Sequence, residues 1–256
     1  MDIFHTAFLS GAGILGGIIA SVVGGAAIVA YPALIATGLT PQFAAVCNLV
    51  ALMPATMLAA LSDRSQLPPL NRAFIGLIVA SVTGAGIGAS LLLLTPQRVF
   101  SVLVPLLLGF ATVLFAFAER ISSYIRARAA GRGHDLTFNV TSLKMLLPVS
   151  FYGGYFGAGV GILMLGVFSV ATGGDYRPAN VTKNFVTSLN GLSAAIVFIA
   201  QGAVPWSHAL PLMAGSVVGG LIGAQIARVV PRKVMRVLIV VVGAALTVSF
   251  ARRYWF

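Results

Sequence analysis

The sequence is poor in charged residues. Of its 256 residues only 8% are charged, with 16 Lys or Arg and 5 Asp or Glu. Soluble domains carry about 25% charged residues, so this scarcity excludes a soluble enzyme of ordinary surface chemistry. Hydrophobic residues make up 59% of the chain, and the mean hydropathy is +1.01. We therefore expect an all-α polytopic membrane protein.

Residues for metal, redox and acid–base chemistry are also scarce. The single cysteine, Cys47, excludes an intramolecular disulfide. The three histidines, His5, His134 and His208, are isolated from one another. The five acidic residues lie in termini or loops: Asp2, Asp63, Glu119, Asp135 and Asp175. We expect no metal site and no cofactor. The absence of acids from the apolar runs argues against an Asp/Glu proton relay and against a membrane-embedded enzyme.

The few charges are strongly unbalanced toward the positive sign. The formal net charge is +11 and the isoelectric point is near 10.9. No basic patch is interleaved with aromatic residues on a soluble module, so we expect no nucleic acid partner. In so apolar a chain, basic residues more often mark cytoplasmic loops and contacts with lipid headgroups of the bilayer.

Long apolar runs are what the sequence has in abundance. A membrane span needs about 20 apolar residues. Eight runs meet this length: 3–23, 41–61, 73–94, 99–118, 145–172, 178–200, 209–229 and 234–250. The first is followed by a glycine break and a short apolar piece, 26–36, and the fifth is interrupted by glycines at 157–161. The alternative for these two broken segments is that they are re-entrant. Asp2 stands where a signal peptide would be basic, so the first run is predicted to be an uncleaved span.

The orientation follows from the basic residues between the spans. With eight spans, nine Lys and Arg fall on one side and seven on the other. The nine are Arg64, Arg72, Arg120, Arg126, Arg128, Arg132, Lys144, Arg252 and Arg253. The positive-inside rule then places both termini and the central loop in the cytoplasm, by a margin of two residues.

The two halves of the chain resemble each other. A shift of 135 residues lays Ile222-Gly223-Ala224 on Ile87-Gly88-Ala89 and Pro231 on Pro96. We predict two homologous repeats of four spans, 1–118 and 145–256, joined by a polar loop at 119–144. Such duplication is usual in secondary transporters, where substrate lies between the repeats. Whether the repeats are parallel or inverted stays open.

The two glycine breaks are the most informative motifs. They contain Gly24 and Gly25 in the first half, and Gly157, Gly159 and Gly161 in the second. Irregular backbone at membrane depth is tolerated where protein or a water-filled cavity satisfies its polar groups. A helix that starts after such a break directs its positive dipole end toward the cavity, which suits an anion. The alternative is a glycine kink or a tight helix crossing.

Lys183 is the one cation that falls within a predicted span, in the run Asn180-Val181-Thr182-Lys183-Asn184. A cation there suggests a function, and the alternative is snorkelling to the interface. Polar side chains surround it on more than one helix face: Thr182, Asn184, Thr187, Ser188 and Asn190. In the first half of the chain, Cys47 and Asn48 occupy the equivalent place. They could line a path or bond between helices. Asp175, just before Pro178, reads as a helix cap.

At these breaks and helix starts the sequence resembles the TauE/SafE-type sulfite exporter family, also called the toluene-sulfonate uptake permease family. The marks are Gly24-Gly25 through Pro32 with Ala44 to Asn48, repeated as Gly157 to Gly161 with Ala179 to Asn184. The family's usual triple glycine reads Gly24-Gly25-Ala26 and Gly159-Val160-Gly161 here, and its Gly-Thr-Ser is replaced by Val46-Cys47-Asn48 and Val181-Thr182-Lys183.

The resemblance implies a two-repeat carrier of the bacterial inner membrane that moves sulfite, sulfonates or related organic anions. The predicted substrate-binding residues are the five glycines of the breaks with Asn48, Thr182, Lys183 and Asn184. The alternatives are a carrier of another small solute, a membrane-embedded enzyme and a subunit of a membrane complex. The substrate, the coupling ion and the oligomeric state, including a homo-oligomer, stay open.

Overall fold

The protein is all-helical. The computed structural model describes residues 3–22, 24–130, 140–171, 175–226 and 232–255. Within these ranges the chain forms ten α-helices and one 3-10 helix, with no strand. The elements are α1 (Ile3–Val22), α2 (Ala27–Ala36), α3 (Pro41–Leu61), η1 (Arg64–Gln66), α4 (Arg72–Leu94), α5 (Gln97–Ala130), α6 (Val140–Tyr155), α7 (Val160–Ala171), α8 (Tyr176–Ala200), α9 (Trp206–Ile226) and α10 (Arg232–Trp255).

The helices include several that can cross a membrane. Among the described residues, five segments are long and apolar enough: Ile3–Val22, Pro41–Leu61, Arg72–Leu94, Gln97–Phe117 and Tyr176–Ala200. A polytopic protein is therefore supported, while the predicted count of eight spans is not confirmed. The first predicted run corresponds to α1 and the short piece 26–36 to α2, while the fifth run is divided into α6 and α7 at its glycine break.

Helix boundaries follow local chemistry. The side chain of Asn71 caps α4 by accepting a hydrogen bond from Phe74 N at 2.8 Å. Asp175 caps α8 by accepting from Arg177 N at 3.1 Å, which confirms the predicted cap. The polar segment 119–144 is not a plain loop, since α5 continues to Ala130 and α6 begins at Val140. The division into 1–118 and 145–256 stays a prediction.

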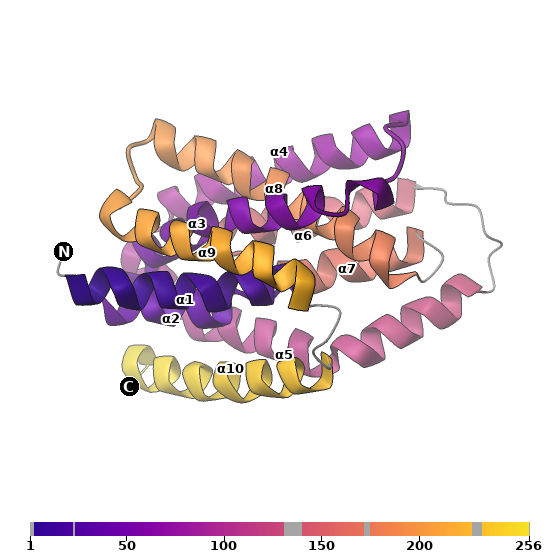
Figure 1. Cartoon of the computed structure of the whole chain (residues 1–256). Coiled ribbons are helices and arrows are strands. Elements are labelled where there is room, and N and C mark those ends of the chain that lie inside the picture. The colour runs from indigo at the N-terminus through magenta and orange to yellow at the C-terminus, as the bar shows by residue number, and fades with distance from the viewer. Residues whose placement is uncertain (1–2, 23, 131–139, 172–174, 227–231, 256) are drawn as a thin grey trace.

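The helices run back and forth along one common axis (Figure 1). α1 begins and α10 ends at the same end of the bundle, whereas α5 ends and α6 begins at the opposite end. The expectation that the central connection lies on the side of the termini is therefore wrong. The physical reason is that the first glycine break turns the chain back between α1 and α2, so five helices rather than four precede the central connection.

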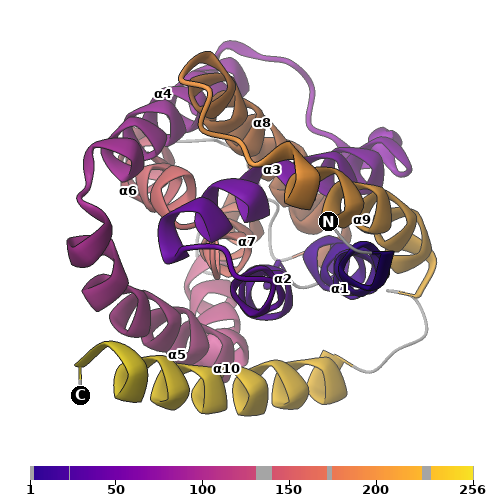
Figure 2. The ribbon, with the colours of Figure 1, turned by 90° about the vertical axis from the view of Figure 1, so that its left-hand side faces the viewer.

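The pairing of helices has an approximate two-fold pattern. α1 packs on α9 while α6 packs on α4, and α3 packs on α8 between them (Figure 2). If α1–α5 correspond in order to α6–α10, the pair of α1 and α9 corresponds to the pair of α6 and α4, and the pair of α3 and α8 corresponds to itself. The helices α1 and α6 run in opposite directions along the bundle (Figure 1). We regard this arrangement as support for a repeat of inverted type.

Glycines permit the closest of these contacts. A methyl group on Gly13 or Gly17 of α1 would meet Leu212 O or Ser216 O of α9. In the corresponding pair, a methyl group on Gly88 of α4 would meet Phe151 O of α6. The spacing of four residues between Gly13 and Gly17 thus marks a tight helix–helix contact.

Candidate functional site

Two interruptions of regular helix lie inside the bundle. α1 ends at Val22 and α2 begins at Ala27, while α6 ends at Tyr155 and α7 begins at Val160. Gly24, Gly157 and Gly159 have φ angles of +89°, +78° and +77°. This left-handed conformation is accessible to glycine at little cost, whereas a side chain would strain it. The glycines thus allow each chain segment to reverse within the membrane.

The two breaks touch each other. A methyl group on Gly24 would lie 2.7 Å from Gly161 Cα, and one on Gly161 would lie 2.6 Å from Gly24 Cα. Only a pair of glycines allows backbones to approach this closely. The contact brings the start of α7 against the segment between α1 and α2, although the two lie far apart in the sequence.

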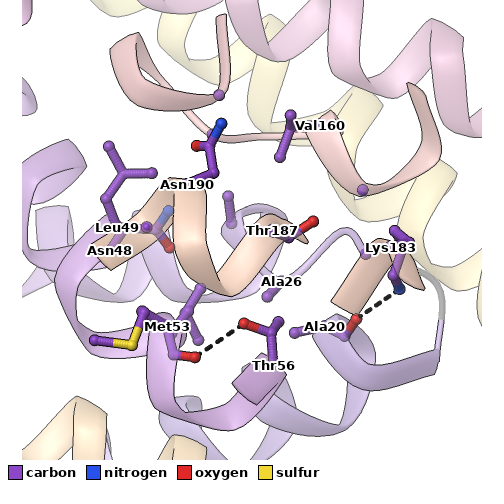
Figure 3. Close-up of a pocket in the computed structure, with 17 residues that line it drawn as sticks. Ala20, Ala26, Asn48, Leu49, Met53, Thr56, Val160, Lys183, Thr187 and Asn190 are labelled. Carbon is purple, nitrogen blue, oxygen red and sulfur yellow. Dashed lines mark hydrogen bonds between the residues drawn. The ribbon is translucent and has the colours of Figure 1, made fainter. Parts of the chain in front are cut away.

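A cavity of about 60 Å³ opens beside this contact (Figure 3). The first turns of both short helices line it with Ala27 of α2 and Val160 of α7. Its polar side chains come from α3 and α8: Asn48, Thr56, Lys183, Thr187 and Asn190. Since a buried water needs roughly 10–15 Å³ by the same measure, the volume suits a few waters or one small polyatomic ion.

Five of the nine predicted site residues line this cavity: Gly24, Asn48, Gly157, Gly161 and Lys183. Gly25 and Gly159 do not. A methyl group on Gly25 would strike the ring of Phe115, and one on Gly159 would lie 3.2 Å from Ala111 Cβ. Both glycines therefore face α5, where they provide close packing.

Lys183 is enclosed by the bundle. Its side chain is 1% exposed, and Nζ donates a hydrogen bond to Ala20 O of α1 at 3.2 Å (Figure 3). Snorkelling to the interface does not occur, because the ammonium points into the cavity wall rather than out of the protein. In the described part of the chain no carboxylate pairs with it, and the ion pair that the structure records there is Arg177 with Asp63.

Lys183 belongs to a row of donors on α8 that hold the last turn of α1. Tyr176 Oη donates to Val22 O at 2.6 Å. The Nδ2 atoms of Asn180 and Asn184 both donate to Ser21 O, at 3.2 and 3.1 Å. These bonds satisfy carbonyls that a helix leaves unpaired at its C-terminal end.

The two remaining predicted site residues, Thr182 and Asn184, do not line the cavity. Asn184 serves the end of α1, and Thr182 is fully buried away from the cavity. In the described residues, Thr182 Oγ1 and the Oδ1 atoms of Asn48 and Asn184 are buried without a hydrogen-bond partner. Of these three residues, Asn48 alone lines the cavity. Its unpaired oxygen therefore belongs to a residue of the cavity wall.

Some lining residues were not among the predicted ligands. Thr187 and Asn190 follow Lys183 at helical spacing, so a helical projection of α8 places them on one side with it. Asn190 Nδ2 also donates to Ser150 O of α6 at 3.2 Å. Thr56 of α3 had no sequence signal, because a threonine in an apolar helix usually bonds to its own backbone, as Thr56 Oγ1 does to Met53 O at 2.9 Å.

Comparison with known proteins places the chain among membrane transporters. Three similar proteins are named as probable membrane transporters. They are "Probable membrane transporter protein ORF9" of Sinorhizobium sp (27% identical, 96% of this chain and 92% of the relative), "Probable membrane transporter protein" of Haemophilus influenzae (22%, 92% and 90%) and "Probable membrane transporter protein YfcA" of Escherichia coli K12 (24%, 91% and 84%).

No solved structure matches the chain. The family model described as "Sulfite exporter TauE/SafE" matches residues 9–250, nearly the whole chain. The match confirms the resemblance seen at the glycine breaks. Together with the apolar helices, it establishes a multi-pass membrane protein of a transporter family. The chain belongs to the TauE/SafE sulfite exporter family.

Proposed function

We propose that this protein is a secondary transporter that binds a small anion in the central cavity. The observation that carries the proposal is the chemistry of the cavity wall, which has the Lys183 ammonium and no acidic side chain. The positive dipole ends of α2 and α7 reach the same wall. The side-chain amide of Asn48 adds a hydrogen-bond donor.

The family's description supports a sulfur-containing anion as the substrate, and we propose sulfite or a sulfonate. The cavity volume of about 60 Å³ fits a small ion better than a bulky one. We further propose that the two halves rock about the contact between Gly24 and Gly161, which exposes the cavity to each side in turn. An ion gradient supplies the driving force.

Replacement of Lys183 by methionine is expected to lower anion flux by about 10- to 100-fold. A hydrogen bond to a charged group contributes roughly 1.5–3 kcal/mol, and methionine keeps the length of the side chain without the charge. The measurement is uptake of labelled sulfite, methanesulfonate and small carboxylates into proteoliposomes. Lys144→Met is the matched control, because Lys144 is an exposed lysine of α6. Equal flux in the two variants, or flux of cations alone, would contradict the proposal.

Fixing the contact between Asp63 and Arg177 is expected to stop transport. Arg177 Nε lies 2.7 Å from Asp63 Oδ2, and this pair joins the loop after α3 to the start of α8. If the halves rock, this distance must change. Cysteines at both positions on a Cys47→Ala background, bridged through two disulfides by a short bis-methanethiosulfonate, should reduce flux at least tenfold. A reductant should restore it.

The control for the bridge is each single-cysteine variant treated with the same reagent, which should keep its flux. Full transport by the bridged protein would exclude movement at this contact and would contradict the rocking of the two halves.

A further inference from the structure

Lys183 has more hydrogen-bond donors than the protein satisfies. An ammonium carries three N–H bonds, and Ala20 O is the acceptor that the structure provides, at 3.2 Å. The side chain is 1% exposed and lines the cavity. Burying an ion without a counter-charge costs several kcal/mol, so an empty cavity disfavours the charged form of this lysine.

Among the described residues, the surroundings of Lys183 offer no other charge. α1 contributes the backbone carbonyl of Ala20, α2 contributes Ala27, and the breaks contribute glycines. α3 contributes Asn48 and Thr56, and α7 and α8 contribute Gly161, Thr187 and Asn190. None of these described groups titrates in the physiological range.

Ionisable groups at the ends of α3 and α8 and inside α3 are engaged elsewhere. Asp63 and Arg177 pair with each other, and Asp175 caps α8. Cys47 of α3 points its Sγ toward Pro205 O, and Tyr176 donates to Val22 O. An anion that enters the cavity is therefore the counter-charge available to Lys183, and Lys183 is the counter-charge available to the anion.

The end of α1 also bears on the coupling ion. In transporters with broken helices, carbonyls at the C-terminal end of a half-helix can bind Na⁺. Here Ala20 O, Ser21 O and Val22 O all accept hydrogen bonds from side chains of α8. The tethered amine of Lys183 thus stands where a free cation would bind.

We propose that Lys183 carries the coupling proton, so that the protein moves one proton together with each monovalent anion. The inference rests on the proposed function and extends it. When the anion leaves the cavity, one N–H bond of the ammonium breaks, the electron pair stays on Nζ, and the proton passes to water. The empty carrier returns with a neutral amine. Loading reverses these steps, with a proton and an anion taken from the same side.

The experiment measures both ions in the same vesicles. Proteoliposomes with a pH-sensitive dye inside are given methanesulfonate, which stays ionised at neutral pH and so cannot carry the proton itself. We expect about one proton to enter per anion, without a requirement for Na⁺. A gradient of one pH unit, acidic outside, should accumulate the anion about tenfold at equilibrium, because one pH unit and a tenfold concentration ratio are equal in free energy.

Lys183→Arg separates charge from proton release. The guanidinium stays charged in proteins, so whatever anion exchange the variant retains should no longer respond to the pH gradient. Lys144→Arg should respond as the wild type does. A wild-type protein that moves the anion without protons, or requires Na⁺, would overturn proton coupling and leave anion transport standing. A wild-type protein that moves no anion at all would overturn both.

Discussion

Replacement of Gly161 by valine is expected to abolish transport and to destabilise the fold. A Cβ at this position would lie 2.6 Å from Gly24 Cα and 2.9 Å from Gly24 O. Both neighbours are backbone atoms, so rotation of a side chain cannot relieve the overlap. Overpacking a core usually costs about 1–3 kcal/mol, and here it would also force the two breaks apart. Thermal stability in detergent and anion flux in proteoliposomes measure the two consequences.

The matched control separates the contact from backbone strain. Gly24 and Gly38 have nearly the same φ, +89° and +91°, but a methyl group on Gly38 would meet nothing within 4 Å. Gly24→Ala should therefore lose far more stability and flux than Gly38→Ala, although both substitutions force alanine into the left-handed region. Similar losses in the two variants would show that the contact between the breaks is unimportant.

The sequence predicts the long helices well, because a run of about 20 apolar residues admits few structures in a membrane. The runs at 41–61 and 73–94 coincide closely with α3 and α4. The short helices were harder to predict. α2 has 10 residues and α7 has 12, which corresponds to about 15–18 Å of helix, so neither spans 30 Å of hydrocarbon alone. The piece 26–36 was not counted as a span and the α7 region was included in the run 145–172, which gave eight spans where the described chain has ten α-helices.

The candidate site was predictable where composition alone is informative. A cation within an apolar run and glycines at matching places in two halves need no knowledge of packing, and Lys183, Gly24 and Gly161 do line the cavity. The sequence does not show which neighbour each residue of a break packs against. Gly25 adjoins Gly24 in the sequence but packs on Phe115 of α5, a residue 90 positions away. Such a neighbour is decided by tertiary contact, which no local pattern encodes.

The corrected order of the helices changes the distribution of basic residues between the two ends. Among the described residues, ten cations lie toward the end where α5 meets α6, and three lie toward the end of the termini. The ten are Arg64, Arg72, Arg120, Arg126, Arg128, Lys144, Arg177, Arg232, Lys233 and Arg236, and the three are Arg98, Arg252 and Arg253. The positive-inside rule then predicts that the end where α5 meets α6 faces the cytoplasm and that the termini lie outside.

This orientation predicts an all-or-none labelling pattern in intact bacterial cells. Ser123 of α5 and Ser207 of α9 are exposed and lie toward opposite ends of the bundle. On a Cys47→Ala background, Ser207→Cys should react with a membrane-impermeant maleimide in intact cells. Ser123→Cys should react only after the cells are permeabilised.

The parent Cys47→Ala protein, which has no other cysteine, should stay unlabelled throughout. The reverse pattern would mean that the charge distribution does not orient this protein. Labelling of both positions from one side would contradict the fold itself, since α6, α7 and α8 lie between the end of α5 and the start of α9 and place them at opposite ends of the bundle. The same reasoning predicts that Asp63 and Arg177 lie toward the cytoplasmic end of the bundle, within one turn of the α8 row that holds the end of α1.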